Sequence, residues 1–151
     1  MAGPDHEKLE LSEERRLFSL GIDEFNAGNF FEAHEIWEDI WRLTLDKRRE
    51  QFYRALIQTA VTLELLRRGR AVGVRQVFLT SQKLFKGLPP IFMGLDIAGH
   101  IENIRHAIEP ALLDLTSREI QIDPARLFQI NLLYDPFEEP RDGEISDPGS
   151  I

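Results

Sequence analysis

The chain has 151 residues, a length typical of one domain that buries its own hydrophobic core. It contains no cysteine, which excludes disulfides, thiolate catalysis and zinc sites built from cysteine. Its net charge of -8 argues against nucleic-acid phosphates as the partner.

Residues 1–10 are polar and acidic, and we expect them to form a flexible leader. They lack the apolar core of a signal peptide. No apolar run in the sequence approaches the roughly 20 residues that span a bilayer. The sequence therefore predicts a cytoplasmic protein that makes no contact with membranes.

An apolar stripe that ends at Phe25 predicts a first helix, and Gly28 suits the left-handed position that follows a helix. Asn29 is expected to cap a second helix over about residues 30–43, with Glu32 in its first turn. At about 100° per residue, the apolar side chains of this second helix share one arc. They are Phe30, Ala33, Ile36, Trp37, Ile40 and Trp41.

The third helix, over about residues 49–68, is apolar on all sides, which is typical of the buried centre of a bundle. We expect Thr59 and Thr62 to bond back to carbonyl oxygens of their own helix. Gln58 is expected to contact another helix, because an unpaired buried amide costs about 1–3 kcal/mol.

A fourth helix is predicted over about residues 71–85, and Asp96 is expected to cap a fifth that ends near residue 113. The apolar connector at residues 91–95 must be covered by other residues. The glycine turns at Gly28 and Gly69 suggest two helical hairpins, as in tetratricopeptide-type repeats. The predicted fold is all-α: a compact bundle of about five helices, built from two helix-turn-helix hairpins and a C-terminal helix.

The domain prediction divides the remainder by composition. Residues 11–115 form a single helical domain, and residues 116–137 form an apolar segment that docks on this domain or on a partner. A short helical turn is expected near Asp123 and Pro124. Residues 138–151 are expected to be a disordered acidic tail.

His34 and Glu38 are the strongest candidates for a functional pair. Their i,i+4 spacing places them on one face of the second helix, at the edge of the apolar arc beside Trp41. One interpretation is a structural ion pair at the boundary of the core. The other is an acid/base pair or a metal-ligand pair that lines a pocket. A zinc protease is not indicated, because Glu38 stands where His-Glu-x-x-His has its second imidazole.

The stretches F-N-A-G-N-F-F-E-A-H-E-I-W-E-D-I-W, F-Y-R-A-L-I-Q-T-A and L-R-R-G-R resemble the family known as "domain of unknown function 309". The resemblance implies a small helical bundle and brings no known activity, substrate or cofactor. In that family pattern a histidine is frequent where this chain has Leu65, and the departure weakens the case for a metal. The family's signature positions are occupied here by Glu32, His34, Glu35, Glu38, Trp41 and Gln58.

Three functions are consistent with these patterns. The first is a binding or scaffold module whose partner is another protein or a second copy of the chain. The second is a metal-binding protein or hydrolase-like enzyme that uses His34 and Glu38, but a metal needs at least three converging ligands. The third is a small-molecule pocket between helices. The residues considered for completing a metal site are Glu35, Gln58, Glu64, His100 and His106, and those for the pocket are Trp37, Trp41 and Phe52.

Overall fold

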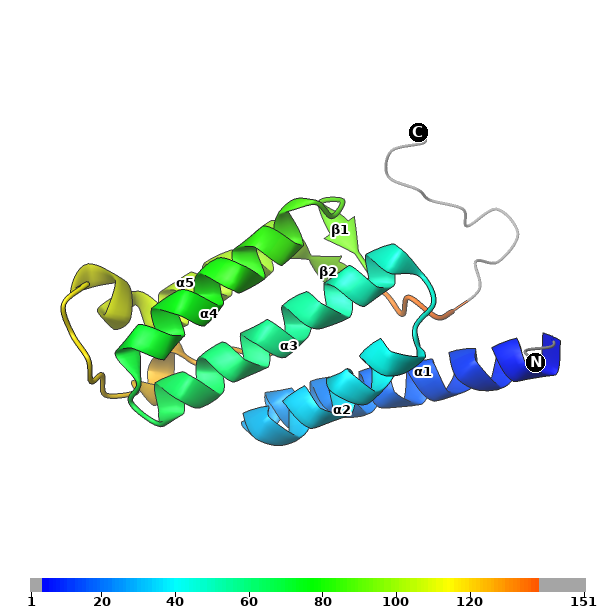
Figure 1. Cartoon of the computed structure of the whole chain (residues 1–151), viewed down its shortest axis with the longest axis horizontal. Helices are drawn as coiled ribbons and strands as arrows, with labels where there is room; N and C mark the ends of the chain where they lie inside the picture. Colours follow the sequence, from blue (N-terminus) through cyan, green and yellow to red (C-terminus); the bar gives the residue numbers. More distant parts are fainter. Residues whose placement is uncertain (1–3, 139–151) are drawn as a thin grey trace.

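A computed structural model of the chain describes residues 4–138, and side chains from residue 11 onward (Figure 1). Glu138 is therefore the one residue of the expected acidic tail that lies inside the described range. The prediction of a compact all-α bundle of about five helices is confirmed. The helices are α1 (Pro4–Asn26), α2 (Phe30–Leu43), α3 (Lys47–Arg67), α4 (Ala71–Lys86) and α5 (Ile97–Leu113).

The first helix is longer than the sequence patterns predict. α1 begins at Pro4, so residues 4–10 of the expected leader are helical, and residues 1–3 lie outside the described range. Proline suits the first turn of a helix because its φ angle is already helical and its missing N–H would have no partner there.

Each of the two hairpins, α1–α2 and α3–α4, turns at a glycine. Gly28 and Gly69 both have a positive φ, at 85° and 75°. Each follows a helix C-terminus and donates its N–H to a carbonyl three residues earlier, at 2.9 and 3.0 Å. The expected cap of α2 is wrong in one respect: the Asn29 side chain donates to Glu24 Oε2 at 2.8 Å and accepts no bond from α2.

The central position expected for the third helix is confirmed. In Figure 1, α3 lies between the α1–α2 hairpin and the pair formed by α4 and α5. Thr59 donates to the Ala55 carbonyl at 3.1 Å, and Thr62 donates to the Gln58 carbonyl at 2.7 Å. Both threonines therefore satisfy their hydroxyl groups within α3, as predicted.

The close contact of α1 with α2 depends on Gly21. A Cβ atom at this position would overlap the indole ring of Trp37, which is completely buried. Phe25 packs against the same indole with ring centroids 6.0 Å apart. A glycine on α1 thus makes room for the largest side chain of the core.

A buried acidic group joins α1 to α3. The Tyr53 hydroxyl donates to Glu14, and Arg49 Nε lies 3.1 Å from Glu14 Oε2. Burial of Tyr53 and the adjacent Glu14 carboxylate raise the pKa of the Tyr53 hydroxyl. The sequence patterns do not indicate this cluster, because the residues come from separate helices.

The connector between α4 and α5 is a small β-hairpin, whereas the sequence predicts no strand. β1 (Ile91–Phe92) pairs antiparallel with β2 (Leu95–Asp96), and the turn residues Met93 and Gly94 both have positive φ. Such a two-residue turn matches the twist of the strands. Two paired residues per strand are too few to produce a period-2 pattern in the sequence.

Residues 127–138, which we call the strap, return across the helices. The side-chain amide of Asn26 donates to the Ile130 carbonyl at 3.0 Å and accepts from the Ile130 N–H at 2.7 Å. The Leu133 N–H donates to the Gly94 carbonyl at 2.7 Å, which places the strap over the β-hairpin. This part of the expected docking segment therefore packs on the chain's own helical domain, after a 3-10 turn at Pro124–Arg126.

Candidate functional site

His34 and Glu38 form the pair that their spacing predicts. His34 Nε2 lies 2.7 Å from Glu38 Oε1, and the two side chains are 23% and 35% exposed. Arg42 Nη2 lies 3.7 Å from the other carboxylate oxygen of Glu38. The Glu38 carboxylate is thus shared by an imidazole and a guanidinium at the edge of α2. A half-exposed ion pair of this kind contributes only about 0–1 kcal/mol to stability.

A groove runs between α2 and α3 beside His34. Its apolar walls are Phe31 from α2 and Val61 and Leu65 from α3, and its volume is about 170 Å³. Phe31 is 43% exposed and stands edge-on to the His34 ring at 5.9 Å. We call this surface the α2–α3 groove, and its remaining lining residues are Glu64 and Arg68.

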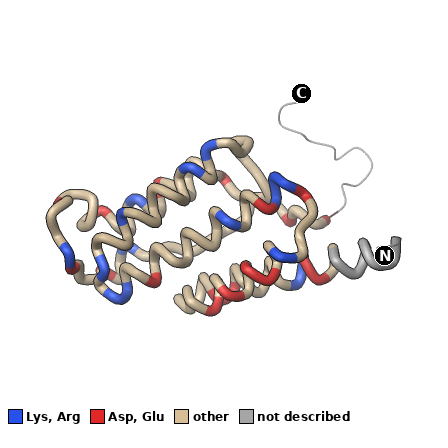
Figure 2. The backbone as a smooth tube through the Cα atoms, viewed as in Figure 1, with Lys and Arg blue, Asp and Glu red and all other residues tan. Residues whose placement is uncertain are grey.

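The α2 side of the groove is mainly negative, whereas Arg68 lies on its α3 side. α2 carries four carboxylates and one arginine, so its net charge is 1 - 4 = -3 with His34 neutral. Glu32 and Glu35 are exposed. Figure 2 shows acidic residues along the α1–α2 hairpin, whereas α4 carries Arg75, Lys83 and Lys86 and no acidic residue.

The six signature residues do not form one site. Trp41 lies ten residues beyond Phe31 on α2, about 15 Å along the helix axis, and its indole N–H donates to Glu50 at 3.2 Å. Gln58 lies on the same face of α3 as Val61, one turn away. The expected bond from its side chain to another helix is not among the hydrogen bonds of the described residues. Of the six, only His34 lines the groove, and Glu38 is bonded to it.

The structure brings no further ligand to His34 and Glu38. Between residues 11 and 138, no three His, Asp or Glu side chains converge as a metal site would require. Glu64 lines the groove, but its carboxylate is paired with Arg67 at 2.7 Å and with Arg68 at 2.9 Å.

The two histidines of α5 are separated from this face and from each other. His100 is 3% exposed, and its Nε2 lies 3.1 Å from Thr59 Oγ1 in the core. Burial lowers the pKa of His100 to about 3. His106 is exposed, and Arg126 donates to its carbonyl at 3.0 Å.

The side chains expected to line a pocket, Trp37, Trp41 and Phe52, line none of the three cavities found among the described residues. Trp37 and Phe52 are completely buried in the core, and Trp41 lies on the surface. Trp37 and Phe52 therefore pack in the core, whereas the Trp41 indole bonds Glu50 at the surface. Cavities of the described residues lie instead at the α2–α3 groove, beside His100, and between α1 and the strap.

The elements of the groove belong to a segment with known relatives. Residues 18–77 match the model of the family described as "Domain of unknown function (DUF309)". The match confirms the resemblance indicated by the motifs. The DUF309 segment contains all of α2 and α3, and therefore the whole α2–α3 groove and the six signature residues.

A curated relative extends beyond this segment. An uncharacterized protein of Aquifex aeolicus (strain VF5) is 28% identical to this chain over 89 residues. The match covers 59% of this chain and 27% of the relative, so the chain spans about a quarter of that protein's length.

No helix within residues 4–138 has both the length and the apolar character needed to cross a membrane.

Proposed function

We propose that this chain is a protein-binding module and that the α2–α3 groove is its docking surface. The observation that carries the proposal is the exposed Phe31 ring beside an apolar groove with half-buried Val61 and Leu65. Exposed aromatic side chains next to apolar pockets are typical of the residues that dominate binding energy at protein interfaces. The relative's greater length agrees with a unit that also occurs within a larger chain.

The size and charge of the groove define the partner. A volume of about 170 Å³ is below the range of about 300–1,000 Å³ for drug-sized ligands and suits one apolar side chain. Glu38 is already paired with His34, so the exposed Glu32 and Glu35 are the carboxylates available to a partner. The partner is therefore a protein segment with an apolar anchor followed by Lys or Arg residues.

His34 and Glu38 have a positioning role in this proposal. Their bond holds the imidazole edge-on to Phe31 and so fixes one wall of the groove. The metal or hydrolase alternative would need at least one more ligand, and the described part of the chain brings none to this pair. The docking function requires only the groove and the acidic edge that are present.

A random peptide library displayed on phage tests the docking surface with the full chain as target. We expect enriched peptides that combine Leu, Phe or Trp with Lys or Arg, and chemical-shift changes confined to α2 and α3. Leu65→Glu places a charge in the groove and should weaken these peptides at least about tenfold, because burying an unpaired charge opposes binding.

The matched control is Leu79→Glu, which changes an exposed leucine on α4 away from the groove. This variant should bind the selected peptides like the unmodified chain. His34→Ala should weaken binding while changing the free energy of unfolding by less than about 1 kcal/mol. Peptides that bind the Leu65→Glu variant as tightly as the unmodified chain would refute the assigned surface.

We also propose the cytoplasm as the location of the protein. The chain needs no disulfide, which suits a reducing compartment. Its net charge of -8 favours solubility among other macromolecules. Cell fractionation followed by detection of the tagged chain would test this, and recovery with the membrane or the extracellular fraction would contradict it.

A further inference from the structure

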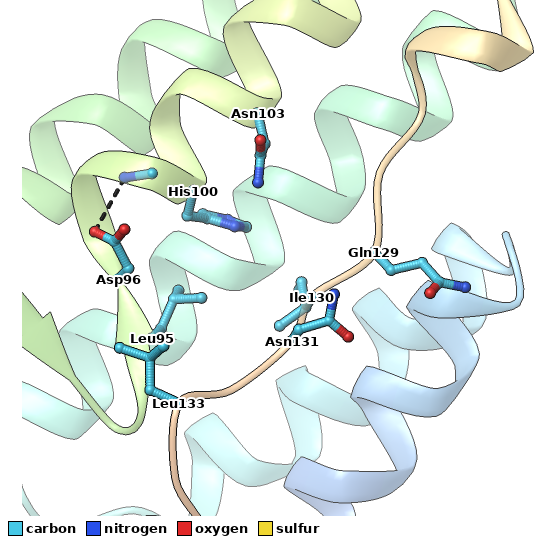
Figure 3. A pocket seen from close by; sticks show the side chains of 9 residues that line it. Leu95, Asp96, His100, Asn103, Gln129, Ile130, Asn131 and Leu133 are labelled. Carbon is cyan, nitrogen blue, oxygen red and sulfur yellow. Dashed lines mark hydrogen bonds between the residues drawn. The ribbon is translucent and has the colours of Figure 1, made fainter.

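A second cavity lies between α5, β2 and the strap. Its volume is about 200 Å³, and apolar side chains from β2 and the strap, including Leu95 and Ile130, line one part of it. Figure 3 shows Asn103 on α5 and Asn131 on the strap, with His100 in the same cavity wall. The strap is needed to complete this cavity, and the α2–α3 groove contributes none of its residues.

His100 lines this cavity, and one of its ring nitrogens has no hydrogen-bond partner among the described residues. The Thr59 hydroxyl donates its proton to the Ala55 carbonyl at 3.1 Å, so Thr59 Oγ1 accepts the bond from His100 Nε2. A neutral imidazole with its proton on Nε2 has an unprotonated Nδ1 that accepts hydrogen bonds. In the described structure Nδ1 has no hydrogen-bond partner, and it keeps some accessible surface. A buried acceptor is therefore available to a ligand.

Apart from the Asp96 carboxylate, the remaining polar groups of the cavity are uncharged. No Lys or Arg of the described residues lines it. Asp96 caps α5 by accepting from the Gly99 N–H at 3.1 Å, and Gln129 donates to the Asn26 carbonyl at 3.3 Å. The side-chain amides of Asn103 and Asn131 remain available, and each offers both a donor and an acceptor. Without a cationic side chain, this lining does not suit an anion.

We propose that this cavity binds a neutral small molecule with adjacent hydrogen-bond donors and acceptors, of the size of a single pyrimidine base or a cyclic amide. One donor of the ligand bonds His100 Nδ1, and its remaining polar edge meets Asn103 and Asn131. The volume of about 200 Å³ leaves room for a single small ring and its substituents. Leu95 and Ile130 contact the apolar part of the ring.

The test uses NMR titration of the full chain with uracil, cytosine and nicotinamide at millimolar concentrations. Acetate and methylammonium serve as charged comparators of small size. We expect at least one neutral compound to shift the Nδ1 nitrogen signal of His100 together with the amides of residues 96–103 and 129–133. Neither charged comparator should shift them.

Two variants separate specific binding from a general response. Replacing both Asn103→Ala and Asn131→Ala removes exposed amides that make no described hydrogen bond, so the fold should persist while affinity falls about tenfold. His106→Gln, on the same helix but outside the cavity, should leave binding unchanged. No shift with any neutral compound, binding of acetate with equal affinity, or unaltered binding by the double variant would overturn the proposal. None of these results bears on the α2–α3 groove.

Discussion

His100 is a neutral side chain in an aromatic cage. The rings of Phe85 and Phe128 stand edge-on to its imidazole at 5.2 and 5.7 Å, and Thr59 accepts its single proton. Burial alone accounts for the lowered pKa, because no charged group contributes to it. His34, by contrast, is partly exposed on α2 and bonds the Glu38 carboxylate.

The pKa of His100 predicts a pH-dependent stability. The value of about 3 in the folded chain lies below the usual value of 6.5, so the unfolded chain binds a proton first as the pH falls. The contribution of neutral His100 to the unfolding free energy is complete above about pH 6.5 and is lost progressively toward pH 3. Between pH 7 and pH 5 the loss amounts to about 2 kcal/mol of unfolding free energy.

Replacement of His100→Gln should remove this component, since glutamine does not titrate and retains a donor for Thr59. Urea denaturation at pH 7 and at pH 5 gives the unfolding free energy of each chain. Between these two pH values it should fall less in the His100→Gln variant than in the unmodified chain. His106→Gln, which changes an exposed histidine of the same helix, should keep the original fall. An identical fall in the His100→Gln variant would show that His100 does not titrate as inferred.

Among the structural elements, the strap depends on one side chain of α1. Asn26 exchanges two hydrogen bonds with the backbone of Ile130, which itself is buried. Phe128 of the strap also packs against Phe25 at 5.6 Å. The Asn26 side chain therefore supplies the donor and the acceptor that a neighbouring β-strand would otherwise offer to the Ile130 backbone, and this holds the extended strap in place.

Asn26→Ala should destabilise the chain by about 1–3 kcal/mol, because it leaves the Ile130 N–H and carbonyl without partners. Hydrogen exchange should accelerate at the Ile130 amide more than at amides within α3. Asn29→Ala is the matched control, since this exposed asparagine bonds the side chain of Glu24 at the surface. Equal protection of the Ile130 amide in the Asn26→Ala and Asn29→Ala variants would contradict this role.

In the whole molecule, residues 116–138 belong to the packing of the helical bundle. Arg118 accepts a backbone bond from Ala71, and Ile120 donates one to Gly69, so this segment also closes the turn between α3 and α4. Phe137 packs against Phe18 at 5.8 Å on the far side of the molecule. We therefore propose that the folding unit extends from the helices through the strap.

A chain that ends at Leu115 should lose much of its stability. Burial of Phe128, Ile130 and Phe137 contributes on the order of 5 kcal/mol, and whole domains are stable by only about 5–15 kcal/mol. Thermal unfolding followed by circular dichroism should show a much lower midpoint. A chain that ends at Glu138 retains every contact described here and serves as the control. Equal midpoints for the two shortened chains would show that residues 1–115 fold independently.

Local sequence patterns were sufficient for the number and order of the helices and for the pair on α2, but not for the start of α1 or the cap of α2. Gly28 and Gly69 end helices because glycine alone adopts a positive φ without strain. α3 is central because it carries apolar residues on all of its faces, and these must be covered by other helices. The contact of His34 with Glu38 follows from i,i+4 spacing within one helix. These features depend on neighbours a few residues away, which a sequence shows directly.

The two candidate binding surfaces could not be predicted from the sequence, because each forms only where separate elements pack together. The α2–α3 groove needs Val61 and Leu65 beside Phe31, and the second cavity needs the strap beside His100. Asn26 and Ile130 are 104 residues apart in the chain, and no periodicity relates them. Such contacts arise because the helices bury their apolar faces together, and the resulting shape selects which distant residues meet.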